Sequence, residues 1–478
     1  MSRRVIQIDW NAYGNADIKE TFIRRGYELA GVGFDSRLPS DKRKVMLDGL
    51  RSDINAFHPD YVFSYHYFPE ISNVCEETDV PYIAWIYDSP VFDLYSPTVL
   101  NHVNHVFVFD RGIYEEFAAG GIPTVHYMPL GVAWRDYGRI MQSGDSSASL
   151  RSAQNDSLMV DLNHNGSLSG GSTQNDRHNS HSIQNDSLTG GSIHNDDLSR
   201  GTVQKDVGYV CDVSFIGSMY TEPKHRLYDK FADISPYAHG YLDAIIEAQK
   251  HLYGVNILQR FITPEIEAEM QKAYPTDPNS ANAMSPAKLY SQFVLSRQVT
   301  AIERREIMEL LGHYSSTGTM THHDDCDSTA GNSSSFIKTS SGDNLSIHLY
   351  THDTSLRIPG ITNNGPVNYG DEMYRIFASS KINLNITLRS ILTGIPLRAL
   401  DIMSCGGFLL SNYQEELCEY FVPGEDFDYY EDYEDLLNKV DYYLTHEKER
   451  RDIARSAHNK IRNEHSLDLR LDAMESYL

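Results

Sequence analysis

The sequence lacks the long apolar runs and the paired cysteines that would place it in a membrane or in an oxidising compartment. No apolar run approaches the roughly 20 residues that cross a bilayer, and the strand-like Val5-Ile6-Gln7-Ile8 follows the N-terminus with no signal-peptide segment between. The five cysteines are scattered and lack the spacing of metal-ligand pairs: Cys75, Cys211, Cys326, Cys405 and Cys418. We therefore expect a cytoplasmic protein with no transmembrane segment and no disulfides.

Positive charge is also scarce. The chain has 41 Lys and Arg residues against 66 Asp and Glu, and its formal net charge is −25. Nucleic acids and anionic lipids attract proteins through clustered Lys and Arg, so no nucleic acid partner is expected, although a local basic pocket could still bind a phosphate. The length of 478 residues predicts more than one core, because single cores rarely grow beyond about 250 to 300 residues.

Apolar and aromatic residues are nearly absent from two tracts. The first, Ser143 to Lys205, carries triplets such as Gln174-Asn175-Asp176 that recur every ten residues. A ten-residue period could build a solenoid, but these repeats lack the apolar positions that stacking would bury, so we expect a disordered insert in a surface loop. The second tract runs from Ser315 to Asp343. Metal binding by its His322-His323-Asp324-Asp325-Cys326 run is the less favoured reading, because ligand spacing on ordered elements is missing.

The rest of the chain alternates short apolar runs with amphipathic stretches. Strands are expected at 5–10, 61–65, 82–87, 105–109, 212–216, 345–350, 381–386 and 408–410, and helices at 18–29, 112–119, 240–251 and 300–311. This alternation is typical of parallel sheets covered by helices on both faces. The sequence therefore predicts an α/β protein with two Rossmann-like, doubly wound domains facing a cleft. The N-terminal domain spans 1–142, and the C-terminal domain spans 208–450 with a polar loop at 315–343. The insert (143–207) separates them, and a terminal helix (451–478) follows.

Ligands of such sheets bind beyond the carboxyl ends of the strands, which makes the residues after each strand candidates for a site. The candidates at three strand ends are Asn11 and Gly14 in a glycine-containing loop, Asp88, and Gly217 with Ser218. A helix-capping turn explains the first loop equally well, and a turn aspartate is the plain alternative for Asp88.

A fourth candidate segment follows the strand expected at 381–386, whose last part includes Asn385. Arg389 and Arg398 suit a diphosphate, because guanidinium groups form forked hydrogen bonds with phosphate. Asp401, three residues after Arg398, could accept hydrogen bonds from sugar hydroxyls, and Gly406 and Gly407 allow a tight turn into the next strand. The alternative for Arg398 and Asp401 is an exposed ion pair within one helix, which would contribute only tenths of a kcal/mol.

One long segment and several short ones resemble a known family. The segment KINLNITLRSILTGIPLRALDIMSCGGFLLSNYQEELCEYFVPGEDFDYYEDYEDLLNKVDYYL, residues 381 to 444, is similar to the C-terminal domain of group 1 glycosyltransferases, specifically the CgeB-like (spore-maturation protein) branch. The pieces PYIAWIYDSP, VFVFDRGIYEEF, MPLGV and DVSFIGSMY resemble the N-terminal domain of that branch. The resemblance implies a GT-B fold, a nucleotide-sugar donor held mainly by the C-terminal domain, no obligatory metal or other cofactor, and a terminal helix that crosses back to the N-terminal domain.

The resemblance also implies roles for the candidate residues. Related enzymes carry two glutamates separated by seven residues; here the second position is Asp401 and the first is Thr393. We expect a metal-independent glycosyltransferase that moves a sugar to an unknown glycan, lipid or protein acceptor. Arg389 and Arg398 would neutralise the leaving diphosphate, with help from Asn385 and from the backbone of Gly217-Ser218. Asp401 would bind donor hydroxyls. Asp88 would be the catalytic acid or base.

Two other functions remain open. The substitution at Thr393 favours a non-catalytic nucleotide- or carbohydrate-binding module in a surface- or spore-assembly system. A nucleotide-sugar epimerase on the same architecture would need acid and base groups around the bound sugar, and the sequence singles out none.

Overall fold

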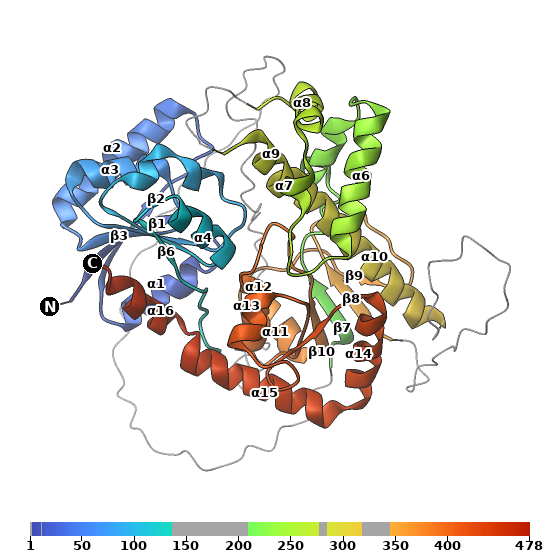
Figure 1. Ribbon diagram of the computed structural model, residues 1–478. Coiled ribbons are helices and arrows are strands. Elements are labelled where there is room, and N and C mark those ends of the chain that lie inside the picture. The colour runs from blue at the N-terminus through green and yellow to red at the C-terminus, as the bar shows by residue number, and fades with distance from the viewer. Residues whose placement is uncertain (1, 11, 136–208, 277–283, 318–344) are drawn as a thin grey trace, which may run out of the picture.

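The computed structural model describes residues 2–10, 12–135, 209–276, 284–317 and 345–478. They form two parallel six-stranded sheets and a helical lobe (Figure 1). The strand orders are β2-β1-β3-β4-β5-β6 and β12-β11-β10-β7-β8-β9. The predicted fold class, an α/β protein with two doubly wound domains in the GT-B arrangement, is confirmed. The repeat insert (143–207) and nearly all of the polar loop (315–343) lie outside the described residues.

The first sheet is buried at its centre. Its strands are β1 (Arg4–Asp9), β2 (Glu28–Gly33), β3 (Tyr61–Tyr65), β4 (Tyr82–Ile86), β5 (Asn104–Val108) and β6 (Val125–Tyr127). Its helices are α1 (Asn15–Arg24), α2 (Ser40–Phe57), α3 (Pro69–Thr78), α4 (Arg111–Ala119) and the 3-10 turns η1 (Phe92–Tyr95) and η2 (Pro97–Leu100). Every residue of β3 and β4 is buried, as expected for central parallel strands that are covered on both faces.

The second sheet has the same plan. Its strands are β7 (Cys211–Ile216), β8 (Ile347–Tyr350), β9 (Thr362–Asn363), β10 (Ser380–Asn385), β11 (Leu409–Asn412) and β12 (Asp428–Tyr430). Its helices are α11 (Asp371–Ser379), α12 (Leu397–Ser404), α13 (Glu415–Tyr420) and α14 (Tyr433–Thr445).

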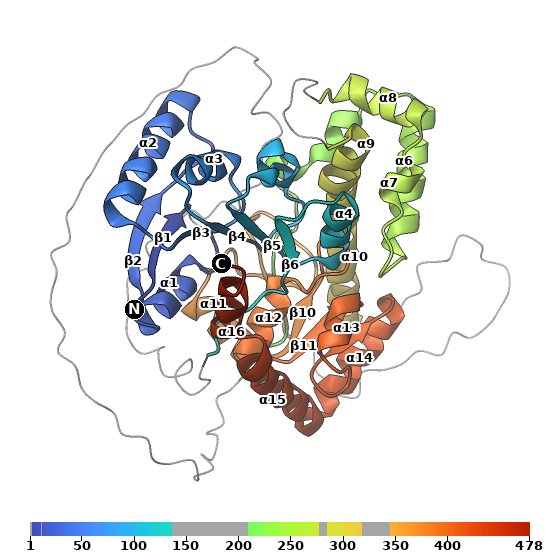
Figure 2. The same cartoon turned by 60° about the vertical axis from the view of Figure 1, so that its left-hand side comes forward.

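The helical lobe is inserted between β7 and β8 and has a hydrophobic cluster of its own. It comprises η5 (Pro223–His225), η6 (Leu227–Phe231), α6 (Pro236–Lys250), α7 (Leu258–Phe261), α8 (Pro264–Ala273), α9 (Pro286–Leu289), the π-helical turn η7 (Tyr290–Leu295) and α10 (Ser296–Thr317). Figure 2 shows these helices in green and yellow beside the second sheet. The long helix α10 joins the two parts, because it packs on α6 of the lobe and on β8 of the sheet.

One predicted helix is only partly helical. The stretch 18–29 was expected to form a single helix, but α1 ends at Arg24, Gly26 adopts a left-handed backbone conformation (φ 77°), and β2 begins at Glu28. The strand was missed because it lies at the edge of the sheet, where its side chains are half-buried or exposed and show no apolar pattern.

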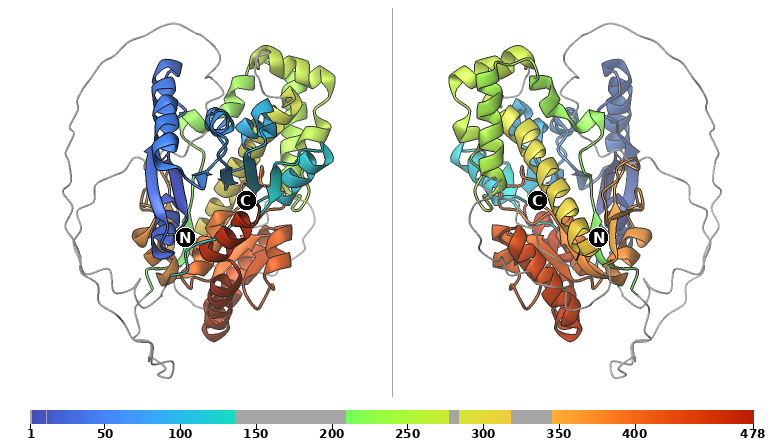
Figure 3. Two further views of the ribbon diagram at one scale, coloured as in Figure 1. Left: turned by 90° about the vertical axis from the view of Figure 1, so that its left-hand side faces the viewer. Right: turned by 90° about the vertical axis from the view of Figure 1, so that its right-hand side faces the viewer.

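The end of the chain contacts both domains. Helix α15 (Glu447–Glu464) packs against α12, and α16 (Leu467–Glu475) packs against α1. The Tyr61 hydroxyl donates to Glu475 Oε1 at 2.7 Å, and Arg24 Nη2 lies 2.7 Å from Asp468 Oδ2. Figure 3 shows the red C-terminal helices running from the second domain to the first. Helices α15 and α16 together therefore connect the two domains.

Candidate functional site

Each sheet has one point where the strand order reverses. In the first sheet it lies between β1 and β3, and in the second between β7 and β10. The carboxyl ends of the strands at such a switch point form a crevice in which open α/β sheets bind ligands. Beyond these ends lie Trp10 and His66 in the first domain, and Ser218 and Thr387 in the second.

A buried arginine bridges the switch point of the second sheet. Arg304 Nη1 of α10 donates to the Ser218 carbonyl oxygen at 2.6 Å, and its Nε donates to the Ile386 carbonyl oxygen at 3.2 Å. Arg304 is only 8% exposed, and burial is the main cause that lowers its pKa, with a further contribution from the charge of Arg398. Among the described residues no carboxylate forms an ion pair with Arg304, although the negative charge of Glu303 acts to raise its pKa.

A second arginine stands at the start of α12. Arg398 is half-buried, and its guanidinium contacts the Met373 sulfur and lies 5.6 Å from the centre of the Phe377 ring. Arg398 and Asp401 do not approach within the 4.0 Å of an ion pair, so the alternative of a simple pair within the helix is wrong. No side chain caps the N-terminus of α12. The Ala399 N–H donates to the Pro396 carbonyl oxygen at 3.0 Å, while the helix dipole and Arg398 favour an anion at this end of α12.

Asp401 is turned away from this site. It is 1% exposed, the Tyr369 hydroxyl donates to its Oδ1 at 3.0 Å, and the Tyr374 hydroxyl lies at 3.5 Å. Burial raises its pKa to about 7, although the charge of Arg398 acts in the opposite direction. Direct binding of donor hydroxyls by Asp401 is therefore contradicted by the geometry, because its carboxylate is enclosed by protein.

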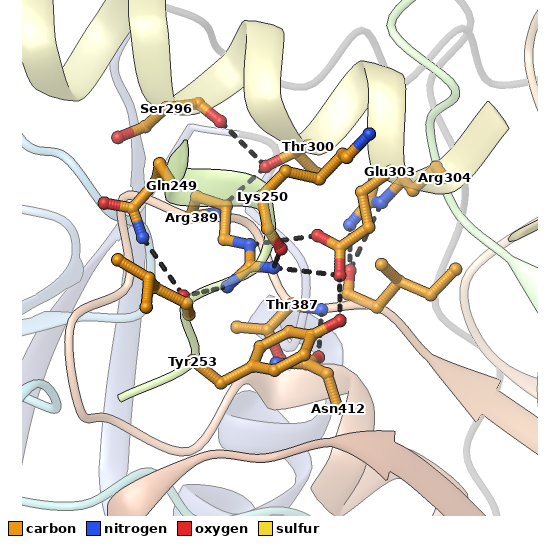
Figure 4. A network of polar contacts seen from close by, with 12 residues as sticks. Gln249, Lys250, Tyr253, Ser296, Thr300, Glu303, Arg304, Thr387, Arg389 and Asn412 are labelled. Atoms are coloured by element: carbon orange, nitrogen blue, oxygen red, sulfur yellow. Dashed lines mark hydrogen bonds and ion pairs between the residues drawn. The ribbon is translucent and has the colours of Figure 1, made fainter. Parts of the chain in front are cut away.

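Arg389 is fully occupied by protein partners (Figure 4). Its Nε donates to Glu303 Oε2 at 2.9 Å and its Nη2 to Glu303 Oε1 at 3.0 Å, while backbone carbonyls of Lys250 and Leu252 accept from Nη2 and Nη1 at 3.0 and 2.9 Å. The Tyr253 ring centre lies 4.1 Å from the guanidinium carbon. The predicted role of Arg389 as a diphosphate ligand is therefore corrected: it ties the loop after β10 to α6 and α10.

Gly217 and Ser218 form a turn whose polar groups are largely used within the protein. The Gly217 N–H donates to the Tyr350 carbonyl oxygen at 3.0 Å, and the Ser218 hydroxyl accepts from the Tyr220 N–H at 3.1 Å. Their predicted contact through backbone donors is not supported for Gly217. Tyr220 itself has a left-handed backbone (φ 55°), an uncommon conformation for a non-glycine residue.

Asn385, Gly406 and Gly407 also have structural partners. The Asn385 amide donates to the hydroxyls of Thr387 and Ser411 at 3.0 and 2.9 Å and is buried in the sheet. Gly406 (φ 78°) and Gly407 lie at the C-terminal end of α12, which at 1.5 Å per residue is about 12 Å from its N-terminus. Gly406 and Gly407 shape the turn between α12 and β11, whereas Asn385 at the end of β10 holds the loop after its own strand to β11.

The first domain contributes the loop between β1 and α1. Asn11 lies outside the described residues. Gly14, the N-cap of α1, has φ 83° and lines a small cavity between the domains together with Asp17, Tyr87, Tyr369 and Leu397. Because Leu397 is the first residue of α12, this cavity places the loop of the first domain opposite the anion site of the second.

Asp88 follows β4 and faces the second domain. Its side chain is exposed to solvent. The neighbouring Ser89 and Ser390 exchange hydrogen bonds, each hydroxyl donating to the other residue's carbonyl oxygen at 2.7 Å. Asp88 is thus held at the meeting point of the domains, where an acceptor could reach it.

Thr393 lies at the junction of the two domains. Its hydroxyl lies 3.1 Å from Asp110 Oδ1 and 2.7 Å from Glu416 Oε1, so it links the two domains. Burial raises the pKa of both acids. A glutamate at position 393 would add a third carboxylate to this buried pair, which threonine avoids.

Sequence reasoning missed His66 and Arg304, which lie at the two switch points. His66 follows a predicted strand just as Asp88 does, so the strand-end rule could have found it. Arg304 lies on a helix 82 positions before its partner Ile386, and no local pattern marks it.

Two features are absent from the described residues. No helix in the described ranges is both long and apolar enough to cross a bilayer. Within the same part of the chain, no group of three or more His, Cys, Asp or Glu side chains is arranged to hold a metal ion.

Comparisons with known proteins found similar solved structures and one family model. Similar solved structures include sucrose-phosphate synthase from Thermosynechococcus elongatus (9% identity over 99% of this chain and 98% of that one, TM-score 0.43) and the Anabaena protein HepE in complex with UDP-glucose (7%, 99% and 98%, 0.43). A third is a UDP-forming trehalose-phosphate synthase from Burkholderia xenovorans (10%, 100% and 98%, 0.44). No curated protein matches the chain. The family model described as glycosyl transferase-like matches residues 337–476, which include β10 and α12.

Proposed function

We propose that the protein is a metal-independent glycosyltransferase that moves a sugar from a nucleotide-diphosphate donor to a hydroxyl group of a glycan, lipid or protein acceptor in the cytoplasm. We also assign it to the CgeB-like branch that the sequence resembles. One observation carries the proposal: the uncapped N-terminus of α12 and Arg398 lie within the region that matches the glycosyl transferase-like family. The buried charge of Arg304 adds to the same positive pole.

This pole suits the leaving group of the reaction. When the bond between the sugar carbon and the diphosphate oxygen breaks, its electron pair stays on the diphosphate and negative charge grows there. Preorganised cations and N–H groups stabilise such charge strongly in a water-poor crevice. Because guanidinium groups and a helix N-terminus supply the neutralisation, the site needs no divalent cation for this step.

The acceptor side is assigned to the first domain. The acceptor oxygen forms the new bond to the sugar carbon, and its proton must be taken up by a base. Asp88 is the candidate base, because its exposed side chain lies beside the contact between the two domains.

A binding experiment tests the donor site. A thermal-shift screen against nucleoside diphosphates and their sugars should reveal a ligand, since a ligand at a hundred times its dissociation constant stabilises the folded state by about 2.7 kcal/mol. Titration calorimetry with that ligand should then show that Arg398→Ala weakens binding about tenfold or more, because a charge-assisted hydrogen bond is worth roughly 1.5 to 3 kcal/mol.

A matched control is Arg305→Ala, which removes an exposed guanidinium paired with Glu309 on α10. It should leave the affinity unchanged. If Arg398→Ala folds normally and binds as tightly as the wild type, the donor site is placed wrongly.

A second candidate function is a non-catalytic nucleotide- or carbohydrate-binding module of a surface- or spore-assembly system. The two positions at which the resembling family carries acids favour this module. Thr393 forms hydrogen bonds at the domain junction, and Asp401 is enclosed by tyrosines. Tight donor binding with no release of nucleoside diphosphate, with or without added acceptors, would support this module over the transferase.

A further inference from the structure

Asp88 lies between two residues that are each anchored to a different domain. On its N-terminal side, the Tyr87 hydroxyl accepts from the Tyr13 N–H at 3.3 Å, and the Tyr87 ring stacks on Trp10 with 6.3 Å between the ring centres. On its C-terminal side, Ser89 is buried and bonds to the second domain. Because consecutive Cα atoms are only about 3.8 Å apart, two anchored neighbours limit where the Asp88 carboxyl can lie.

The contact of Ser89 with the second domain is a reciprocal pair of hydrogen bonds. The Ser89 hydroxyl donates to the Ser390 carbonyl oxygen, and the Ser390 hydroxyl donates to the Ser89 carbonyl oxygen, both at 2.7 Å. Both residues are buried, and hydrogen bonds in such surroundings are stronger than those in water. Two bonds between the same residues fix their orientation as well as their separation.

Ser390 belongs to a loop that is itself held firmly in the second domain (Figure 4). The loop connects β10 with α12. The N–H of its neighbour Arg389 donates to the Thr300 hydroxyl at 3.0 Å, and the Arg389 guanidinium forms an ion pair with Glu303. The same loop leads into the N-terminus of α12, where Arg398 stands. The fold of the second domain therefore sets the position of Ser390 relative to the proposed donor site.

The Asp88 carboxyl itself has no fixed partner in the part of the chain that the structure describes. Asp88 is exposed, and within that part its oxygens form no hydrogen bond and no ion pair. Its backbone neighbours therefore determine its place. This matters for a base, whose oxygen must come within about 3 Å of the acceptor oxygen, because misplacement by about 1 Å can cost about a hundredfold in rate.

We propose that Ser390, through its paired hydrogen bonds with Ser89, is a positioning residue that holds Asp88 at the reacting atoms. The inference rests on the glycosyl transfer proposed above, with Asp88 as its base. In that step, the acceptor O–H bond breaks and its proton passes to Asp88, the acceptor oxygen bonds to the sugar carbon, and the nucleoside diphosphate leaves with the electron pair of its bond. Because the serine pair joins the domains, Asp88 is in place only while they are docked at this contact.

The test compares catalysis with donor binding in Ser390→Ala and Ser89→Ala. The probes are UDP-glucose, UDP-N-acetylglucosamine, GDP-mannose and dTDP-glucose, and the readout is release of nucleoside diphosphate with water or an added sugar as acceptor. The kcat of either variant should fall about tenfold or more. Calorimetry should give donor affinities within about twofold of the wild type, since each hydroxyl is bonded within the protein. The double variant should lose no more than either single one, because the two hydroxyls act as a unit.

A second comparison shows whether the serine pair acts through Asp88. Asp88→Asn removes the base, so it should lower kcat at least as much as either serine variant. Adding Ser390→Ala to Asp88→Asn should then change the residual rate by less than about twofold. If Ser390→Ala lowers the rate by the same factor in both backgrounds, the serine pair acts on another part of the site and the inference is refuted.

The matched control is Ser315→Ala. The Ser315 hydroxyl is buried and donates to the Leu345 carbonyl oxygen at 2.8 Å, so this variant loses the same kind of bond within the second domain. Its midpoint of urea unfolding should fall about as much as that of Ser390→Ala, while its kcat stays within about twofold of the wild type. An equal loss of kcat in the control would mean that the serine variants act by general destabilisation, which would overturn the proposal.

The outcomes separate the two proposals. If no probe binds, or if a probe binds and nucleoside diphosphate is never released, the glycosyl transfer fails and this inference fails with it. If the wild type turns over but both serine variants, or Asp88→Asn, keep the full kcat, the transfer stands and the positioning role is refuted. If Ser390→Ala does not fold, Ser89→Ala decides, because Ser89 is the less deeply buried of the two residues.

Discussion

Replacing Asp401 with asparagine should stabilise the protein increasingly as the pH rises from about 4 to about 7. The Asp401 carboxyl is 1% exposed, and burial raises its pKa from 3.8 to about 7. A folded-state pKa above the unfolded value means that the native protein holds this proton more tightly than the unfolded chain. Raising the pH through this window therefore costs stability in the wild type.

The magnitude follows from the same pKa difference. One unit corresponds to about 1.4 kcal/mol, so ionising Asp401 in the folded protein costs about 4 kcal/mol above pH 7. Asparagine keeps the shape of the neutral carboxyl, still accepts from Tyr369 and never ionises. The difference in unfolding free energy between mutant and wild type should thus grow by about this amount between pH 4 and pH 7 and then level off.

Urea unfolding at several pH values between 4 and 8 measures this difference, and every other titrating group cancels between the two proteins. Tyr369→Phe provides a second variant, because it removes the hydrogen bond to Asp401. In the wild-type background it should lower the unfolding free energy more at pH 8 than at pH 5. In the Asp401→Asn background its effect should not depend on pH. If the unfolding free energies of mutant and wild type changed with pH in parallel, Asp401 would ionise at little cost in the folded protein. That result would refute the enclosure of its carboxylate. Donor affinity should not change in Asp401→Asn.

Three further substitutions test the packing around the site by urea unfolding. Arg389→Ala should cost about 3 to 5 kcal/mol, because it leaves Glu303 buried without its partner; a loss below about 1 kcal/mol would contradict the buried pair. Thr393→Val should cost about 1 to 3 kcal/mol by removing the hydroxyl between two buried acids, and an unchanged midpoint would argue against the domain link. Gly407→Ala should cost about 1 to 3 kcal/mol, since a Cβ there would lie 2.9 Å from a backbone oxygen. The matched control is Gly240→Ala on α6, where a Cβ would meet open space, and it should not destabilise the protein.

Much of the fold was predictable because it depends on local patterns. Alternating apolar runs and amphipathic stretches identified the central strands of both sheets, where burial on both faces demands continuous apolar residues. The edge strand β2 was missed, because half-exposed residues carry no such signal. The strand-end rule led to the region of Asp88 and Arg398, since the topology of a parallel sheet sets where ligands can enter.

The sequence by itself determined that this protein has two doubly wound domains and where along the chain their strand ends lie, because secondary structure and sheet class follow from residue patterns over short distances. Only the tertiary structure decided which charged side chains are paired or enclosed within the protein and which are not. Arg389 meets Glu303 from a helix 86 positions earlier, Asp401 lies under a tyrosine 32 positions away, and Arg398 remains without an acid partner among the described residues. A side chain's chemistry depends on its burial and on its neighbours in space, and these are set when distant segments pack together.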